Sequence, residues 1–304
     1  MKSSYIFFAL LAAALYALNA PFSKLLLSDS TIGASMMAAF LYLGAGIGLC
    51  FVRVLNPKRA PHTPITKKEF PYIAGMIVLD IAAPILLMLG LERCDAASAS
   101  LLNNFEIVAT SVIALCIFRE KISRPTWLAI ALVTAASMVL GIAGNGGGNG
   151  VGTAGAVTSG TGAMTFGTGA LFILGACVCW GFENNCTRSL SARDPAETTM
   201  IKGLGSGTGA LIVALISGEF FPAPGSILPV LLLGFVAYGL SINFYILAQR
   251  GLGAAKTSAF YSAAPFLGVL FSFLILGERP AALFWVGCAM MAAAAGILVW
   301  DSRE

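Results

Sequence analysis

Charged side chains are scarce in this chain. Asp, Glu, Lys and Arg make up only 11% of its 304 residues, whereas 58% are hydrophobic, and soluble domains carry about 25% charged residues. This deficit excludes an ordinary soluble domain and predicts a protein that lies in a lipid bilayer. The net charge of +4 is spread over many short loops, so it does not indicate a nucleic-acid-binding surface.

Histidine and catalytic motifs are also nearly absent from the sequence. The one histidine, His62, lies in a basic loop beside two prolines, and neither an HExxH nor a GxSxG motif occurs. The seven cysteines form no CxxC pair and fall almost entirely within apolar runs, which favours reduced packing residues. A membrane enzyme needs a nucleophile, a metal or an acid–base pair. The sequence therefore predicts no catalytic residue, no metal site and no cofactor, in a protein that is not an enzyme.

Long apolar runs fill most of the chain instead. A helix needs about 20 apolar residues to cross about 30 Å of hydrocarbon, and a backbone that faces lipid must form its hydrogen bonds within the helix. The pattern predicts an all-α integral membrane protein with ten transmembrane helices. They are expected at residues 4–27, 31–53, 68–91, 95–118, 125–143, 168–190, 197–217, 227–249, 253–276 and 281–300. The first run lacks a convincing cleavage site and continues to Leu27, which favours an uncleaved span over a signal peptide.

Two segments of the first half of the chain return in the second half. The segment Tyr16–Lys24 is echoed 164 positions later by Trp180–Arg188, and Phe118–Lys121 is echoed 158 positions later by Leu276–Arg279. Each half holds five predicted spans, and an odd number of crossings makes the two copies face opposite sides of the membrane. Inverted repeats of this kind are typical of secondary transporters.

The boundary between the two repeats is marked by composition. Residues 144–169 are rich in Gly, Thr and Asn and free of charge, which predicts a flexible linker. The expected division is therefore a first five-helix repeat at 1–143, the linker at 144–169 and a second five-helix repeat at 170–304.

The positive charges predict the orientation of the chain. If the N-terminus is cytoplasmic, fifteen of the 18 lysines and arginines fall on the cytoplasmic side and three, Lys24, Arg93 and Arg279, fall on the other. Lys202 is counted among the fifteen. Cytoplasmic loops carry an excess of lysine and arginine, so both termini are predicted to be cytoplasmic.

Three carboxylates stand inside the predicted spans, where ionisable residues are costly and usually mark a transport pathway. Asp80 and Glu106 lie at the middle of the third and fourth spans, and Glu183 lies nearer the cytoplasmic end of the sixth. Asn103 is one turn from Glu106 on the same helix face. These positions predict a substrate-binding site near the bilayer midplane, lined by Asn103, Glu106 and Asp80. The alternative is a polar contact that only holds neighbouring helices together.

The polar end of the sixth span has two interpretations. Glu183 and Asn184 lie about one turn from Arg188, and an arginine near the membrane interface tied to these groups would be structural. The matching Asn19 and Lys24 of the first repeat favour a role shared by both copies, such as a gate at each membrane face. Both interpretations stay open.

Aromatic and hydroxyl residues gather in the eighth and ninth spans. Tyr245, Asn243 and Tyr261 suit a substrate with an apolar body and a polar head, although core packing is an equal alternative. Pro265 frees a backbone carbonyl and predicts a hinge. Glu120 and Glu278 occupy matched helix ends. We expect each to form a salt bridge that sets the following turn, which is a structural role.

The residues discussed above resemble one known family. The segment Leu15–Asn19 with Lys24, the stretch Asn103–Glu120, and Tyr261–Pro265 followed by Leu276–Arg279 are similar to EamA-type members of the drug/metabolite transporter superfamily. The similarity covers nearly the whole chain and both repeats. One departure is Ile107, which stands where the first copy of the pattern usually has proline.

The resemblance implies a secondary transporter that exports or exchanges small metabolites across the bacterial inner membrane by alternating access. Its implied substrates are amino-acid-like or amine-like solutes, and it would act in the bilayer as a monomer or homodimer without nucleic acid. Proton coupling through Glu106 and uncoupled facilitation are both compatible with the sequence. The alternatives are a membrane-embedded enzyme or lipid-handling protein and a cation channel, and the inverted repeat favours the transporter.

Overall fold

The computed structural model describes residues 2–29, 32–55, 65–91, 105–145, 168–277 and 282–303, and within these ranges the chain is helical and contains no strand. Asn103, Glu278 and His62 lie outside the described residues, as do residues 146–167 of the expected linker. The remaining linker positions belong to the helices on either side.

The helices of the two repeats follow one another along the chain. Those of the first repeat are α1 (Lys2–Ala17), α2 (Asn19–Asp29), α3 (Ala34–Leu55), α4 (Phe70–Leu91), α6 (Phe105–Cys116) and α7 (Arg124–Asn145). Those of the second repeat are α8 (Thr168–Ser189), α9 (Pro195–Ile216), α10 (Pro224–Leu233), the π-helical segment η1 (Gly234–Leu240), α11 (Ser241–Tyr261), α12 (Ala264–Leu276) and α13 (Ala282–Arg303).

Many of these helices have the length and composition of membrane spans. Six segments of the described residues are long and apolar enough to cross a membrane, namely Ser3–Ser23, Ser35–Leu55, Phe70–Leu87, Pro195–Ile216, Pro224–Tyr261 and Ala282–Ser302. A 22-residue helix such as α3 is about 33 Å long at 1.5 Å per residue, which matches the hydrocarbon thickness. Helix α8 is as long but is not among the six, because its second half carries Glu183, Asn184 and Asn185. The protein is therefore a multi-pass membrane protein.

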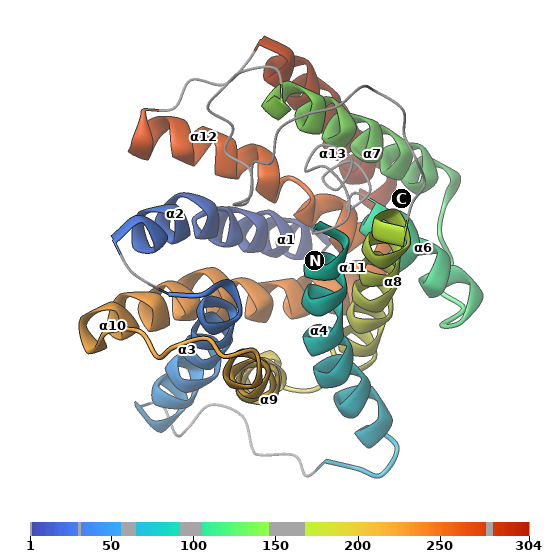
Figure 1. Cartoon of the computed structure of the whole chain (residues 1–304). Coiled ribbons are helices and arrows are strands. Elements are labelled where there is room, and N and C mark those ends of the chain that lie inside the picture. Colours follow the sequence, from blue (N-terminus) through green and yellow to red (C-terminus); the bar gives the residue numbers. More distant parts are fainter. Residues whose placement is uncertain are drawn as a thin grey trace.

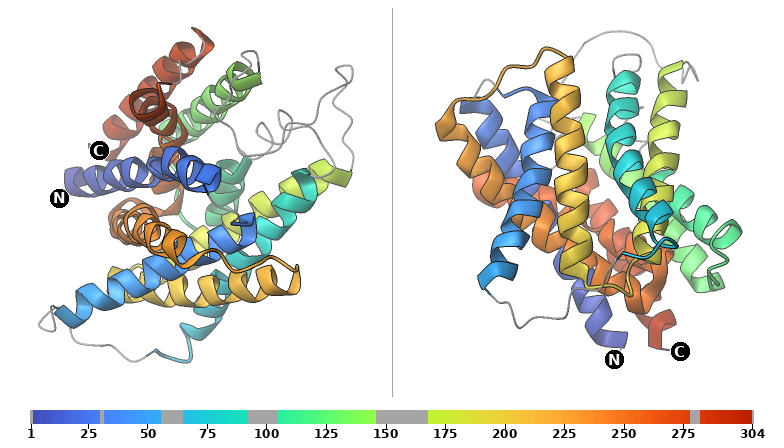
Figure 2. Two further views of the ribbon diagram at one scale, coloured as in Figure 1. Left: turned by 60° about the vertical axis from the view of Figure 1, so that its left-hand side comes forward. Right: turned by 90° about the horizontal axis from the view of Figure 1, so that it is seen from below.

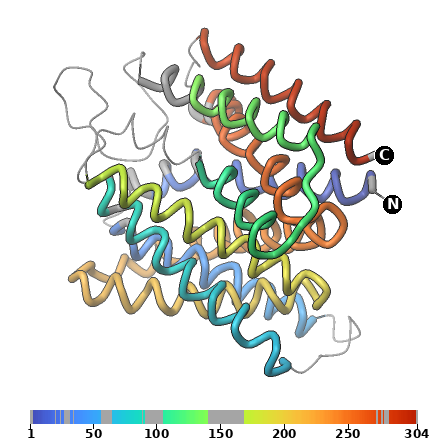
Figure 3. The backbone as a smooth tube through the Cα atoms, turned by 90° about the vertical axis from the view of Figure 1, so that its right-hand side faces the viewer, coloured from blue at the N-terminus to red at the C-terminus, as the bar shows by residue number. Residues whose placement is uncertain are grey.

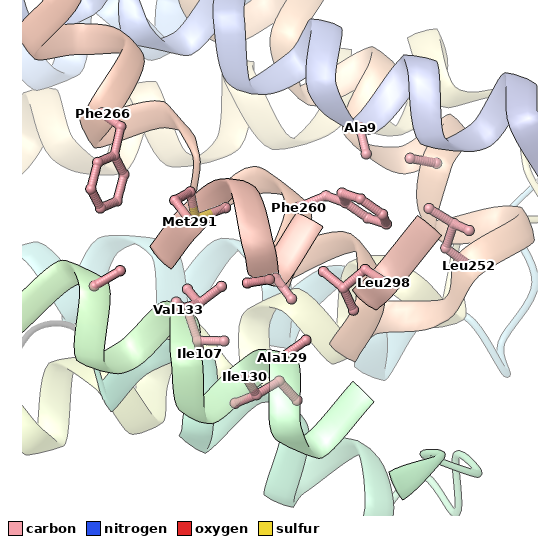
Figure 4. Close-up of a cluster of buried hydrophobic side chains, with 14 of the residues drawn as sticks. Ala9, Ile107, Ala129, Ile130, Val133, Leu252, Phe260, Phe266, Met291 and Leu298 are labelled. Carbon is pink, nitrogen blue, oxygen red and sulfur yellow. The ribbon is translucent and has the colours of Figure 1, made fainter. Parts of the chain in front are cut away.

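The two repeats are interleaved rather than set side by side. Helix α4 packs along α8, α3 along α9, α1 along α11 and α7 along α13, so each of these contacts joins one repeat to the other (Figure 1). The two described chain ends lie together at one end of the bundle (Figures 2 and 3). An apolar cluster containing Ile130, Phe260, Met291 and Leu298 fills the space between α7, α11 and α13 (Figure 4).

Glycines allow the close contact between α3 and α9. A Cβ atom at Gly203 would lie 2.6 Å from the backbone nitrogen of Gly46, and one at Gly207 would lie 2.8 Å from that of Leu43. Small residues at this spacing let helix backbones approach closely in a membrane. Gly203 and Gly207 thus allow α3 and α9 to pack with their backbones close together.

Several helices are interrupted near the centre of the bundle. Leu18 separates α1 from α2, η1 widens the helix between α10 and α11, and Ser262–Ala263 separates α11 from α12, which begins with Ala264 and Pro265. A further break lies inside α11, where Gly253 adopts a left-handed φ of 80° and the chain turns. These breaks divide α1–α2 and α10–α12 into shorter rigid pieces, whereas α8 and α9 run without interruption over 22 residues each.

The backbone repeats itself at the offsets that the sequence predicts. Arg119, which has a left-handed φ of 55°, is 158 positions before Gly277, whose φ is 71°. The hydroxyl of Ser23 donates to Asn19, and 164 positions later the hydroxyl of Thr187 donates to Glu183. The two copies therefore share local geometry as well as residue types.

Candidate functional site

The polar half of α8 contacts helices of both repeats. Side chains of α6, α9 and α11 meet it through hydrogen bonds or an ion pair, and α4 packs along α8. The residues of α8 that make these contacts fall into two groups, one around Glu183 and one around Asn184.

The first group is a buried ionic cluster, defined as Asp80, Glu183 and Lys202. Their side chains come from α4, α8 and α9, and each residue is at most 7% exposed. The Lys202 ammonium lies 2.9 Å from Glu183 Oε1 and 3.8 Å from Asp80 Oδ1. The Tyr42 hydroxyl donates to the same Asp80 oxygen at 3.0 Å. One lysine thus serves two carboxylates that are removed from solvent.

The position of Lys202 corrects one sequence expectation. This residue was expected among the cytoplasmic positive charges, but it is the eighth residue of α9 and its ammonium is buried against two carboxylates. The electrostatic attraction of those carboxylates stabilises a charge that the surrounding apolar helices would otherwise exclude. The sequence signal that was overlooked is this single cation beside the Gly-rich run of α9.

The second group centres on the Asn184 side chain. Its amide nitrogen donates to Glu106 Oε1 and to the Thr110 hydroxyl, both at 3.2 Å, and its carbonyl oxygen accepts from the Tyr245 hydroxyl at 3.2 Å. Tyr245 in turn lies 2.7 Å from the Ser258 hydroxyl. Unlike Asp80 and Glu183, Glu106 is only partly buried. It is therefore the least buried of the three acidic residues.

Five tyrosines join the two groups along the other side of the site. We call them the tyrosine arc. In order of contact they are Tyr42, Tyr238, Tyr16, Tyr261 and Tyr245, with ring centroids 5.1, 5.5, 5.4 and 4.9 Å apart. The arc begins at Asp80 and ends at Asn184. Because Asn184 follows Glu183 in α8, the arc and the ionic cluster together form a closed ring of polar and aromatic side chains.

The two sides of this ring differ in chemistry. The ionisable groups come from α4, α6, α8 and α9, whereas four of the five tyrosines come from α1, η1 and α11. The helix breaks lie beside these tyrosines: Tyr16 precedes the break at Leu18, Tyr238 lies within η1, and Tyr261 is the last residue of α11. A charged face thus opposes an aromatic face built on interrupted helices.

Other residues singled out in the sequence lie outside the ring. Asn243 is half-buried on α11, two positions before Tyr245 and therefore on another helix face. Asn19 accepts from Ser23 within its own helix, and Pro265 is exposed at the start of α12. The side chain of Lys24 lies outside the described part of the structure. Of the candidate residues, the structure brings together Asp80, Glu106, Glu183, Asn184, Tyr245 and Tyr261.

The structural alternative for Glu183 needs correction. Arg188 was considered as the partner that would tie Glu183 in place, but its guanidinium donates to the Ser191 hydroxyl at 2.8 Å, while Glu183 pairs with Lys202. Arg188 lies more than one turn further along α8, toward the end of the helix, and the ammonium of Lys202 enters from α9 instead. The charge on Glu183 is therefore compensated from within the second repeat.

Glu120 joins the two repeats at the end of α6. Its carboxylate accepts from the Ala254 backbone N–H at 3.0 Å and lies against Gly253, where α11 turns. Burial raises the pKa of Glu120, while the Ala254 N–H and the charges of Arg188 and Lys256 act in the opposite direction. The sequence predicts a salt bridge of Glu120 at its own helix end. In the structure its carboxylate instead caps a turn in the other repeat.

A set of charged residues joins segments at the end of the bundle that holds both described chain ends (Figure 2). The short loop between α8 and α9 is held there by arginines: Arg250 donates to the carbonyl oxygens of Ser191 and Arg193 at 2.7 and 2.6 Å. Arg193 lies 2.9 Å from Glu69, which precedes α4, and 3.2 Å from Glu197. Hydrogen bonds from Thr66 and then from Arg193 lower the pKa of Glu69 to about 2. We refer to Glu69, Arg193 and Arg250 as the arginine latch.

The described residues contain no group of three or more His, Cys, Asp or Glu side chains that could hold a metal ion. The arrangement can instead bind a solute through a carboxylate, an amide and aromatic rings, at a contact between two repeats of an integral membrane protein.

Comparison with known proteins identifies this membrane protein class. The model of the EamA-like transporter family matches residues 3–142 and 167–300, one match for each repeat. An uncharacterized transporter from Methanothermobacter thermautotrophicus is 24% identical over 315 residues, which cover 96% of this chain and 85% of that protein. A chain of a solved crystal structure superposes with a TM-score of 0.77 at 16% identity, covering 100% of this chain and 99% of its own length.

The two matches of the family model span most of the chain. The chain belongs to the EamA-like transporter family, which confirms the resemblance to EamA-type drug/metabolite transporters. Family membership and the transporter homologue indicate a membrane transporter rather than an enzyme.

Proposed function

We propose that this protein is a secondary transporter that exports or exchanges small amino-acid-like or amine-like metabolites across the bacterial inner membrane by alternating access. The observation that carries the proposal is the ring of charged and aromatic side chains, which lies where the two repeats meet. Buried polar residues at the interface of inverted repeats are where secondary transporters bind their substrates.

The proposal includes ten membrane crossings in two inverted five-helix repeats, with both termini cytoplasmic. In this arrangement α1 and α2 form one crossing, and the turn at Gly253 separates a crossing made of α10, η1 and the first part of α11 from one that ends with α12. The two described chain ends lie at one end of the bundle (Figure 2), as an even number of crossings requires. The arginine latch at this end is consistent with the excess of positive charge on the cytoplasmic side.

Alternating access requires one end of the pathway to close while the other opens. The latch joins the first repeat, through Glu69, to the loop of the second repeat that carries Arg193, so it is suited to hold the cytoplasmic end shut. At the opposite end, α2 and α12 follow the breaks beside the tyrosine arc and α10 precedes one of them, so these pieces are suited to move. The proposed pathway therefore runs past Glu106 and Asn184, between the latch and the interrupted helices.

Proton coupling is a further part of the proposal. The charged groups that act on Glu106 are Glu183 of α8, Lys202 of α9 and Asp80 of α4, and Tyr245 of α11 and Cys177 of α8 also face it. Its hydrogen-bond donor in the described structure is the neutral amide of Asn184. A carboxylate in such a place can hold a proton when the site is empty and release it when a solute binds.

The experiment that tests the function is solute flux into proteoliposomes of the purified protein. The panel contains labelled neutral, aromatic and cationic amino acids and organic amines, with and without a pH gradient. We expect saturable movement of one solute class, and stimulation by the gradient would support proton exchange over facilitation. Conductance that does not saturate would indicate a channel, and chemical conversion without movement would indicate an enzyme.

A further inference from the structure

The buried ionisable groups of the site do not balance. Asp80, Glu183 and Glu106 supply three carboxylates, and within the described part of the chain Lys202 is the cation that contacts this group. Full ionisation would leave two negative charges without a counter-charge among the described residues of the surrounding helices. Uncompensated charge inside a membrane protein is costly, so the site favours a bound proton or a ligand that brings positive charge.

Lys202 already pairs with the carboxylates of Glu183 and Asp80. Its ammonium lies 2.9 Å from Glu183 and 3.8 Å from Asp80, and its stem is buried. It is therefore not free to bind the carboxylate of a solute. The other nearby cation, Arg188, donates to Ser191 near the end of α8. A zwitterionic or anionic solute at Glu106 would find no available positive partner among the described residues.

We propose, building on the transport function above, that the transported solute is a net cationic amine whose ammonium group pairs with Glu106. The partly exposed Glu106 supplies the charge, and the Asn184 carbonyl oxygen supplies a neutral acceptor beside it. The tyrosine arc faces the solute body, because tyrosine rings attract both cations and apolar groups. Amino acids with a free carboxylate are rejected, since their negative charge meets three carboxylates.

The test compares headgroups on a constant body. The probes are labelled phenethylamine, phenylalanine, 3-phenylpropanoate and 3-phenylpropanol, together with the propyl counterpart of each. Saturable counterflow is measured in proteoliposomes, with protein-free liposomes to subtract passive diffusion. We expect saturable counterflow of the amines only, with phenethylamine favoured over propylamine by the tyrosine arc.

Variants locate the charge that selects the amine. Glu106→Gln should reduce amine counterflow at least tenfold, and Glu106→Asp, which keeps the charge, should recover part of it. Glu219→Gln is the matched control, because Glu219 caps the start of α3 through the Ser35 and Met36 N–H groups, away from the ring. The folded state of each variant is checked by size-exclusion chromatography and thermal unfolding.

The outcomes separate the two proposals. Saturable counterflow of phenylalanine, phenylpropanoate or phenylpropanol at a rate equal to the amines would overturn the charge selectivity and leave the transport function standing. Amine counterflow that is unchanged in Glu106→Gln would overturn the assignment of Glu106. Absence of saturable movement for every probe, in folded protein, would count against both the transport function and this inference.

Discussion

Helices α1–α2 and α8 open the two repeats and occupy corresponding positions, yet they differ in shape and in chemistry. Both contain the same hydroxyl bond, from Ser23 to Asn19 and from Thr187 to Glu183. Helix α8 is continuous and places Glu183 and Asn184 in the site, whereas the chain breaks at Leu18 and presents Tyr16. The two copies of the repeated unit thus differ. Helix α8 contributes to the charged face, and the interrupted α1–α2 contributes to the aromatic face.

This difference suits an alternating-access protein. A charged group that must hold a solute or a proton needs fixed partners, and continuous helices supply them. A face that must open needs positions where helical geometry changes, and such positions lie beside Tyr16, Tyr238 and Tyr261. The inverted repeat therefore supplies one binding face and one moving face rather than two equal halves.

Removing the positive charge of Lys202 from the charged face is expected to have the largest effect, which is a loss of stability. Lys202→Met leaves Glu183 and Asp80 without their buried partner, and the loss of one partner of a buried pair costs about 3–5 kcal/mol. We expect the largest fall in melting temperature of the variants described here, measured by thermal unfolding in detergent. The double variant Lys202→Met/Glu183→Gln should recover part of the loss, and a double variant no more stable than the single one would contradict the pairing.

Making α8 resemble its counterpart should weaken solute binding. Asn184 corresponds to Ala20 of the first repeat, so Asn184→Ala imports the residue of the other copy and removes the bonds to Glu106 and Tyr245. Loss of buried hydrogen bonds costs about 1–3 kcal/mol, so we expect the half-saturation concentration to rise roughly tenfold or more. An unchanged half-saturation concentration in the flux assay would remove Asn184 from the binding face.

Disrupting the aromatic face should affect the rate more than the affinity. Tyr16 contacts the rings of Tyr238 and Tyr261, and an aromatic pair contributes about 0.5–1.5 kcal/mol beyond its buried area. Tyr16→Ala should slow the maximal flux several-fold, while Tyr16→Phe, which keeps the ring contacts, should stay near the wild-type rate. Equal rates for the two variants would show that the ring contacts do not govern the motion.

The smallest effect is expected at the latch. The pKa of Glu69 is lowered from 4.5 to about 2, so its stabilising contribution is complete above pH 4.5 and is lost as the pH falls toward 2. Because the Glu69 side chain is partly exposed, the contribution is modest. Glu69→Gln should increase amide hydrogen exchange in the α8–α9 loop at pH 7 and have a smaller effect at pH 3, with Lys67→Gln as a control. A difference of equal size at both pH values would contradict the ionic latch.

The sequence anticipated much of this fold and part of the site. Apolar runs indicated the helices, and the echoes at 158 and 164 positions correspond to repeated backbone features at Arg119 and Gly277. The cost of charge in a membrane singled out Asp80, Glu106 and Glu183, and the structure brings them together around α8. Local sequence patterns therefore identified a site residue where that residue was unusual for its segment, as a carboxylate is in an apolar helix.

What the sequence did not reveal depends on contacts between distant segments. Tyr16 and Tyr42 are ordinary aromatic residues in apolar helices, and only packing against Tyr238 makes them part of the site. Lys202 lies close enough to a helix start to resemble an interfacial charge, and its burial follows from the meeting of α4, α8 and α9. Asn243 was selected for its polarity, but its helix phase directs it away from the face of Tyr245.

The most direct test of the account is the maximal saturable flux of Glu106→Gln relative to Glu219→Gln in proteoliposomes. The account predicts that the first variant loses transport while the second, with a carboxylate removed from a helix cap, stays near the wild-type rate. Both proteins must show the same unfolding temperature within error. Equal flux through the two variants would contradict the central claim that solutes bind at Glu106, between the charged and the aromatic face.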